Sequence, residues 1–84
     1  MLLKNNVYRV FKIFFEHPEK EFHLREIARV TRLSTTAVSS ALRELYRKNI
    51  IVKKEIGIYG MFKADMKNEN FKEMKKAFEI LEKL

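Results

Sequence analysis

The sequence predicts a mainly α-helical domain with one small β-hairpin (α+β), in the order helix, strand, helix, helix, strand, strand, helix. Four segments repeat apolar residues at helical spacing, and a run rich in β-branched residues is followed by two glycines and a second short strand. The length of 84 residues is that of one small domain, so we expect residues 1–84 to fold as a single unit.

The N-terminal segment predicts a helix over about residues 4–16. Its apolar residues share one face at a spacing of three and four: Leu3, Val7, Val10, Phe11 and Phe14. Pro18 ends this helix, because the residue before a proline avoids the helical conformation. Phe22 and Leu24 then alternate with polar neighbours, which indicates a very short strand or extended link.

Two helices joined by a tight turn are predicted over about residues 24–31 and 35–48. In the first, Ile27, Ala28 and either Val30 or Thr31 face inward. Ser34 is a good N-cap for the second. The buried face of the second helix consists of Val38, Ala41, Leu42 and Leu45. Its opposite face carries polar side chains, with Thr35 and Ser39 on the flank: Thr36, Ser40, Arg43 and Arg47. Asn49 follows the C-terminal end of this helix, where the backbone is often left-handed and asparagine is the usual substitute for glycine.

A hairpin and a last helix complete the chain. Residues 50–56 form one strand, 57–60 the turn, with Ile58 and Tyr59 at its tip, and 61–64 the return strand, so the hairpin covers about residues 50–64. Residues 68–84 are amphipathic, and Asn68 or Asn70 caps them. The apolar stripe of this last helix packs either on the first helix or on a second copy of the chain. We expect a homodimer, because the apolar spacing resembles that of a short coiled coil. The expected dimer contacts are Phe71, Met74, Phe78 and Leu81.

Composition argues against several functional classes. The chain has no cysteine and only two histidines, so a thiolate or histidine metal centre and a cysteine nucleophile are not expected. It has no glycine-rich phosphate loop and no catalytic constellation, so we expect neither an enzyme nor a cofactor, and no small-molecule ligand is evident. The absence of a long apolar run indicates a cytoplasmic protein with no membrane partner.

The positive charge is concentrated in the middle of the sequence. Of the net charge of +7, residues 25–63 hold +6, with nine basic and three acidic side chains. The two ends are nearly neutral. A polyanion is therefore the expected partner of the central segment.

The predicted order of elements is that of a winged helix-turn-helix. Residues 22–45, FHLREIARVTRLSTTAVSSALREL, closely resemble the winged helix-turn-helix domains of prokaryotic transcription regulators of the MarR and ArsR type, most of all archaeal versions. The resemblance covers about residues 5–65 and is sharpest over 22–52. Related sequences often have glycine at the position of Arg32, where the backbone is left-handed, and arginine at the position of Ser40. The resemblance implies that Arg32 is left-handed at a cost of about 1 kcal/mol, and that sequence specificity is either modest or dependent on DNA shape.

The resemblance also implies that the chain is a transcription regulator that binds double-stranded DNA with some sequence preference. The helix at 35–48 would lie in the major groove, and the wing at 53–63 on the phosphate backbone or in the minor groove. The expected DNA contacts are Thr35, Thr36, Ser39, Ser40, Arg43, Arg47, Lys53, Lys54, Tyr59 and Lys63.

Other interpretations remain open at this point. An exposed basic helix face is common on proteins without a nucleic-acid partner, and lysines on edge strands protect against aggregation. The fold also serves as a protein-interaction adaptor that does not bind nucleic acid, and the apolar residues Ile58 and Tyr59 favour that alternative. RNA or Z-form DNA is a further possible ligand.

Overall fold

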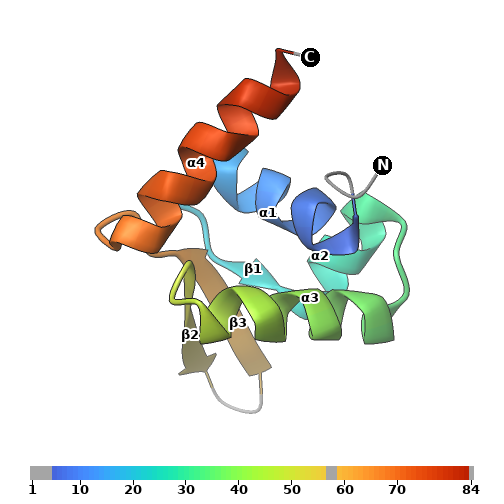
Figure 1. Cartoon of the computed structure of the whole chain (residues 1–84). Coiled ribbons are helices and arrows are strands. Elements are labelled where there is room, and N and C mark those ends of the chain that lie inside the picture. The colour runs from blue at the N-terminus through green and yellow to red at the C-terminus, as the bar shows by residue number, and fades with distance from the viewer. Residues whose placement is uncertain (1–4, 57–58, 84) are drawn as a thin grey trace.

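The computed structural model describes residues 5–56 and 59–83, which form four helices and three strands in the predicted order (Figure 1). The elements are α1 Asn6–Glu16, β1 Phe22–His23, α2 Leu24–Thr31, α3 Thr35–Arg47, β2 Ile51–Ile56, β3 Tyr59–Ala64 and α4 Glu69–Glu82. Within this part of the chain, none of the helices has the length and hydrophobicity to cross a membrane.

Side-chain caps start all four described helices. At α2 the cap is His23, whose Nδ1 accepts a hydrogen bond of 3.2 Å from the backbone N–H of Arg25. Asn5 accepts a hydrogen bond of 2.9 Å from the backbone N–H of Tyr8 at the start of α1. Ser34 accepts one of 3.1 Å from Ala37, which confirms it as the N-cap of α3. Of the two candidates for α4, Asn68 is the cap. Each cap satisfies one of the backbone N–H groups that a helix start leaves free.

Two left-handed residues end α2 and α3. Arg32 has φ 61° and ψ 26°, so the chain turns sharply into α3, as the resemblance implied. Asn49 also has φ 61°. The N–H of Asn49 donates to the carbonyl of Tyr46, and the N–H of Ile50 donates to that of Leu45, both at 3.0 Å. This pair of hydrogen bonds is a Schellman motif, which satisfies carbonyls at the end of α3.

The three strands form an antiparallel sheet in the order β1-β3-β2. The ladder between β2 and β3 extends to the pair of Ile56 and Tyr59. The expected turn over 57–60 was therefore too long, because Tyr59 and Gly60 already pair with β2. Residues 57 and 58 lie outside the described part, and with them the predicted position of Ile58 at the tip of the turn.

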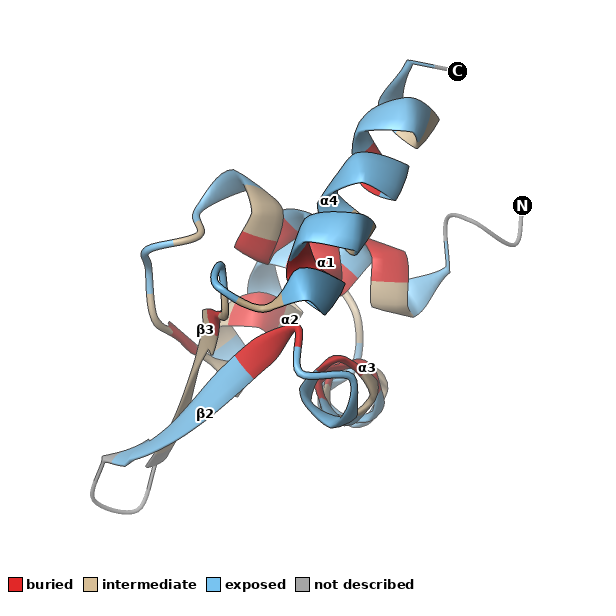
Figure 2. Ribbon diagram, turned by 60° about the vertical axis from the view of Figure 1, so that its left-hand side comes forward, coloured by how far each residue is buried: buried red, intermediate tan, exposed pale blue. Residues whose placement is uncertain are grey.

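Helix α1 lies between α3 and α4 and supplies the centre of the core (Figure 1). The whole predicted inner face of α3 is buried, as are Val10, Phe11 and Phe14 of α1. In α2, Thr31 is the inward residue of the two candidates, since the side chain of Val30 is 63% exposed. In the described part of the hairpin strands only the pair next to the helices, Ile51 and Ala64, is buried. Residues 52–55 of β2 are exposed, and residues 60–63 of β3 are half-buried (Figure 2).

Helix α4 packs on α1 within the same chain. Phe78 meets the rings of Tyr8, Phe11 and Phe15 at centroid distances of 5.1, 5.8 and 4.4 Å, and Phe71 meets Phe11 at 5.7 Å. Phe71 and Phe78 are each only 4% exposed. They were expected as dimer contacts, but their faces are already covered by α1. The structure thus places these two side chains as in the intrachain alternative.

Candidate nucleic-acid interface

The outer face of α3 carries the side chains that the sequence predicted for it. Thr36, Ser40, Arg43 and Arg47 are all exposed, and Thr35 is exposed at the start of the helix. Ser39 is half-buried on the side that faces the hairpin. Because Val38, Ala41, Leu42 and Leu45 anchor the inner face, the orientation of the outer face is fixed by the core.

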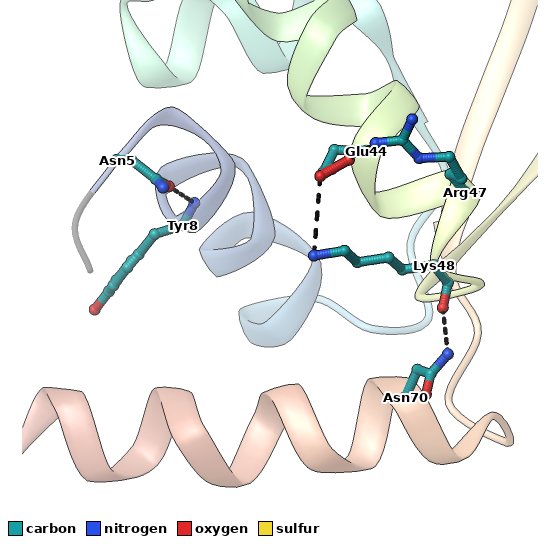
Figure 3. A network of polar contacts seen from close by, with 6 residues as sticks. All are labelled: Asn5, Tyr8, Glu44, Arg47, Lys48 and Asn70. Atoms are coloured by element: carbon teal, nitrogen blue, oxygen red, sulfur yellow. Dashed lines mark hydrogen bonds and ion pairs between the residues drawn. The ribbon is translucent and has the colours of Figure 1, made fainter. Parts of the chain in front are cut away.

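The two arginines of α3 differ in their surroundings. Arg47 forms an ion pair with Glu44, which also lies 3.9 Å from the ammonium of Lys48 (Figure 3). Arg43 forms no ion pair with any residue that the structure describes. Its guanidinium therefore has its five donors available to an anion without first leaving a partner.

The register of the hairpin separates the predicted lysines onto two faces. Lys53 pairs with Phe62 and shares the face that also holds buried Ile51 and Ala64, which is the face toward α3. Lys54 and Lys63 lie on the opposite face, because side chains alternate along a strand. The structure therefore brings Lys53, but not the other two lysines, toward the polar residues of α3.

A cleft of about 240 Å³ lies between α3 and the hairpin. Its lining comes from α2, α3 and both long strands: Leu24, Ser39, Leu42, Arg43, Tyr46, Lys53 and Phe62. Three of the predicted contacts, Ser39, Arg43 and Lys53, thus meet at one site. The sequence analysis missed Tyr46, which is 53% exposed. Its position three residues after Arg43 and seven after Ser39 places it on the same side of the helix, and this spacing could have identified it.

Acidic side chains form ion pairs with two of the three lysines of the hairpin. Lys53 lies 3.2 Å from the carboxylate of Glu55, and Lys54 lies 3.9 Å from that of Glu21. Both ion pairs are largely exposed, so each contributes little to stability and is easily exchanged for another anion. The side chain of Tyr59 lies outside the part of the structure that is described, so its expected DNA contact remains a prediction.

The start and end of α2 are held by contacts that support this surface. Lys20 forms an ion pair of 3.0 Å with Glu26, and this contact lowers the pKa of the Glu26 carboxyl, helped by the backbone N–H of His23. At the other end, Arg9 of α1 donates a 2.6 Å hydrogen bond to the carbonyl of Thr31. A cation at this position is favourable because helix C-termini carry partial negative charge.

Comparison with known proteins identifies the fold. No protein-family model matches the sequence, and a search of curated proteins gave no match. The structure is similar to the crystal structure of MepR, a transcription regulator of the Staphylococcus aureus multidrug efflux pump MepA, with a TM-score of 0.71 and 17% sequence identity. The likeness covers 94% of this chain but 60% of the MepR chain, so this chain spans less than two thirds of its neighbour's length. The chain has a winged-helix fold like that of MepR, as its resemblance to MarR-type sequences implied.

Proposed function

We propose that this chain is a transcription regulator that binds double-stranded DNA with a sequence preference. Helix α3 enters the major groove with its outer face, and the hairpin lies along the phosphate backbone or in the minor groove. The observation that carries the proposal is the division of α3 into a fully buried apolar face and an outer face of threonine, serine and arginine. Such a regulator acts in the cytoplasm of a prokaryotic cell, where its DNA lies.

The charge distribution supports this proposal. The segment with a net charge of +6 forms α2, α3 and the hairpin, which together make the helix-turn-helix and its wing. Arginine and lysine side chains there would contact phosphates and supply affinity. The short hydroxyl side chains on α3 let its backbone approach the base edges closely. Thr35, Thr36, Ser39 and Ser40 are the proposed groove contacts, Arg43 and Arg47 reach guanine or phosphate, and Lys53, Lys54, Tyr59 and Lys63 contact the backbone.

Selection from random duplex DNA tests the function most directly. We expect the purified protein to enrich a palindromic motif, because a symmetric dimer would read two half-sites. If a dimer neutralises about six phosphates, log K should fall against log salt with a slope near −5. The double variant Arg43→Ala/Arg47→Ala should lose binding, whereas Lys72→Ala/Lys75→Ala on α4 should not. A flat salt response, or no binding at all, would contradict the proposal and favour the adaptor alternative.

We also propose that the chain acts as a homodimer joined through α4. Phe71 and Phe78 pack on α1, so the α4 side chains left for a partner are half-buried Met74 and Leu81 and exposed Ile80. Sedimentation equilibrium with the wild type and with Ile80→Glu tests this. A monomeric wild type, or an unchanged dimer in the variant, would contradict dimerisation through this face.

A further inference from the structure

The cleft between α3 and the hairpin has an apolar floor and two cationic side chains in its lining. Half-buried Leu24 and Phe62 supply apolar surface with buried Leu42 beneath them, while Arg43 approaches from α3 and Lys53 from β2. A volume of about 240 Å³ is below the roughly 300–1,000 Å³ typical of sites for free small molecules. The cleft therefore suits a small part of a larger anionic molecule better than an independent ligand.

The two cations differ in whether an acidic side chain already occupies them. Arg43 has no ion-pair partner among the described residues, so it offers a permanent, uncompensated charge. Lys53 is held by Glu55 at 3.2 Å, and the side chains of the two are 43% and 66% exposed. An exposed pair of this kind is weak, so a phosphate that enters the cleft can replace the carboxylate.

The side chain of Lys53 crosses the hairpin over Gly60, where no side chain obstructs it. Gly60 pairs with Glu55, on the same face of the sheet as Lys53 and Phe62. A Cβ added at Gly60 would lie 3.1 Å from Cε of Lys53, which is closer than an ordinary van der Waals contact. Since only the flexible end of a lysine is crowded, a methyl group there would displace the ammonium rather than the fold.

We propose that Arg43 and Lys53 hold one and the same DNA phosphate in this cleft, and that Gly60 positions Lys53 for it. The attached sugar lies against Leu24 and Phe62, and Tyr46 stands beside it at the rim. This inference rests on the proposed function as a DNA-binding protein. It adds that the recognition helix and the wing clamp a single backbone unit between them, instead of contacting the backbone independently.

Salt dependence of binding distinguishes one shared phosphate from two separate ones. Each neutralised phosphate contributes about 0.9 to the slope of log K against log salt. With the duplex recovered by selection, Arg43→Gln and Lys53→Met should each weaken binding but leave the slope nearly unchanged, because the other cation still neutralises the phosphate. The double variant should reduce the magnitude of the slope by about 0.9 per bound chain. Lys76→Met on α4 is the control and should change neither quantity.

Two separate phosphates would give a loss of about 0.9 in each single variant and about 1.8 in the double variant, which would overturn the inference. An unchanged slope in the double variant would overturn it as well. In all these cases the wild type still binds DNA steeply, so the proposed function stands; if the wild type does not bind, both fail together.

Gly60→Ala tests the positioning role. We expect it to weaken wild-type binding by no more than Lys53→Met does, and to have no further effect when combined with Lys53→Met. Equal losses in both backgrounds would show that Gly60 acts on something other than Lys53. Thermal unfolding checks that the variant keeps its fold.

Discussion

Arg32 stands at the point where α2 turns into α3, with a left-handed backbone that favours glycine. Any residue with a Cβ is strained there by roughly 1–2 kcal/mol. The strain is local, but the left-handed backbone conformation that causes it sets the angle at which α3 leaves α2. It therefore contributes directly to where the outer face of α3 points.

We predict opposite effects of alanine and glycine at two neighbouring arginines. At position 32, Arg32→Gly should be more stable than Arg32→Ala by about 1 kcal/mol, because only glycine is relaxed at positive φ. At Arg29, which lies in the last turn of α2, the glycine variant should be less stable than the alanine variant by about 1 kcal/mol. Urea unfolding of the four variants measures both differences; the same sign at both positions would refute this explanation.

At the scale of the elements, α4 is fixed to α1 by an aromatic cluster around Phe78. Phe78→Ala should reduce the free energy of unfolding by about 3–5 kcal/mol, because it leaves a cavity between two helices. Ile80→Ala is the matched control on the same helix; its side chain is 63% exposed, so its change should stay within about 0.5 kcal/mol. Equal losses in dilute protein would mean that Ile80 is part of the intrachain core.

The other contact between these helices depends on pH. The hydroxyl of Tyr8 donates a hydrogen bond to the carboxylate of Glu82, and this bond, with burial and the nearby charge, raises the pKa of Tyr8 from 10.0 to about 12. The folded chain thus holds the phenol proton more tightly than the unfolded chain does. The stabilisation is present below pH 10 and is lost as the pH rises from 10 to about 12.

We therefore expect the free energy of unfolding to fall more steeply over this range in the wild type than in Tyr8→Phe, which has no proton to lose. Urea unfolding at several pH values between 9 and 12 measures the difference. Parallel curves for the two proteins would contradict the role of the Tyr8–Glu82 contact.

The sequence predicted the elements well because local signals and core packing agree in this chain. For α3, Ser34 marks the start, Asn49 marks the end, and the apolar stripe between them has helical spacing. The structure confirms all three. The length of the hairpin turn was wrong because ladder pairing at Tyr59 is a cross-strand property. The placement of Phe71 and Phe78 could not be decided from the sequence, since an amphipathic stripe does not say which partner covers it.

The candidate site shows the same limit. The outer face of α3 followed from helical periodicity alone. The cleft did not, because it needs the register of β2 on β3 to show that Lys53 and Lys54 point to opposite faces. Tyr46 was missed although its spacing from Ser39 and Arg43 puts it on their side of the helix; only its place in the cleft beside the hairpin depends on how the strands pack.

At the scale of the whole molecule, acidic side chains neutralise part of the positive charge on the basic surface. Glu44 lies beside both Arg47 and Lys48 at the end of α3 (Figure 3). Glu44→Gln should strengthen DNA binding about two- to fivefold at low salt, because the two cations lose a competing partner. The matched control is Glu69→Gln, which removes a similar ion pair with Lys72 on α4. Anisotropy titrations measure both; equal gains would mean that only net charge matters.

The end of α3 is also a mechanical junction. The side chain of Asn70, in the first turn of α4, donates a 2.7 Å hydrogen bond to the carbonyl of Lys48, directly after the last residue of α3 (Figure 3). This bond and the shared packing on α1 link the orientation of α4 to that of α3. In a pair of chains joined through α4, the crossing angle of the two α4 helices would then fix the separation of the two α3 helices. The number of base pairs between half-sites would be set at the end of the molecule farthest from the bases.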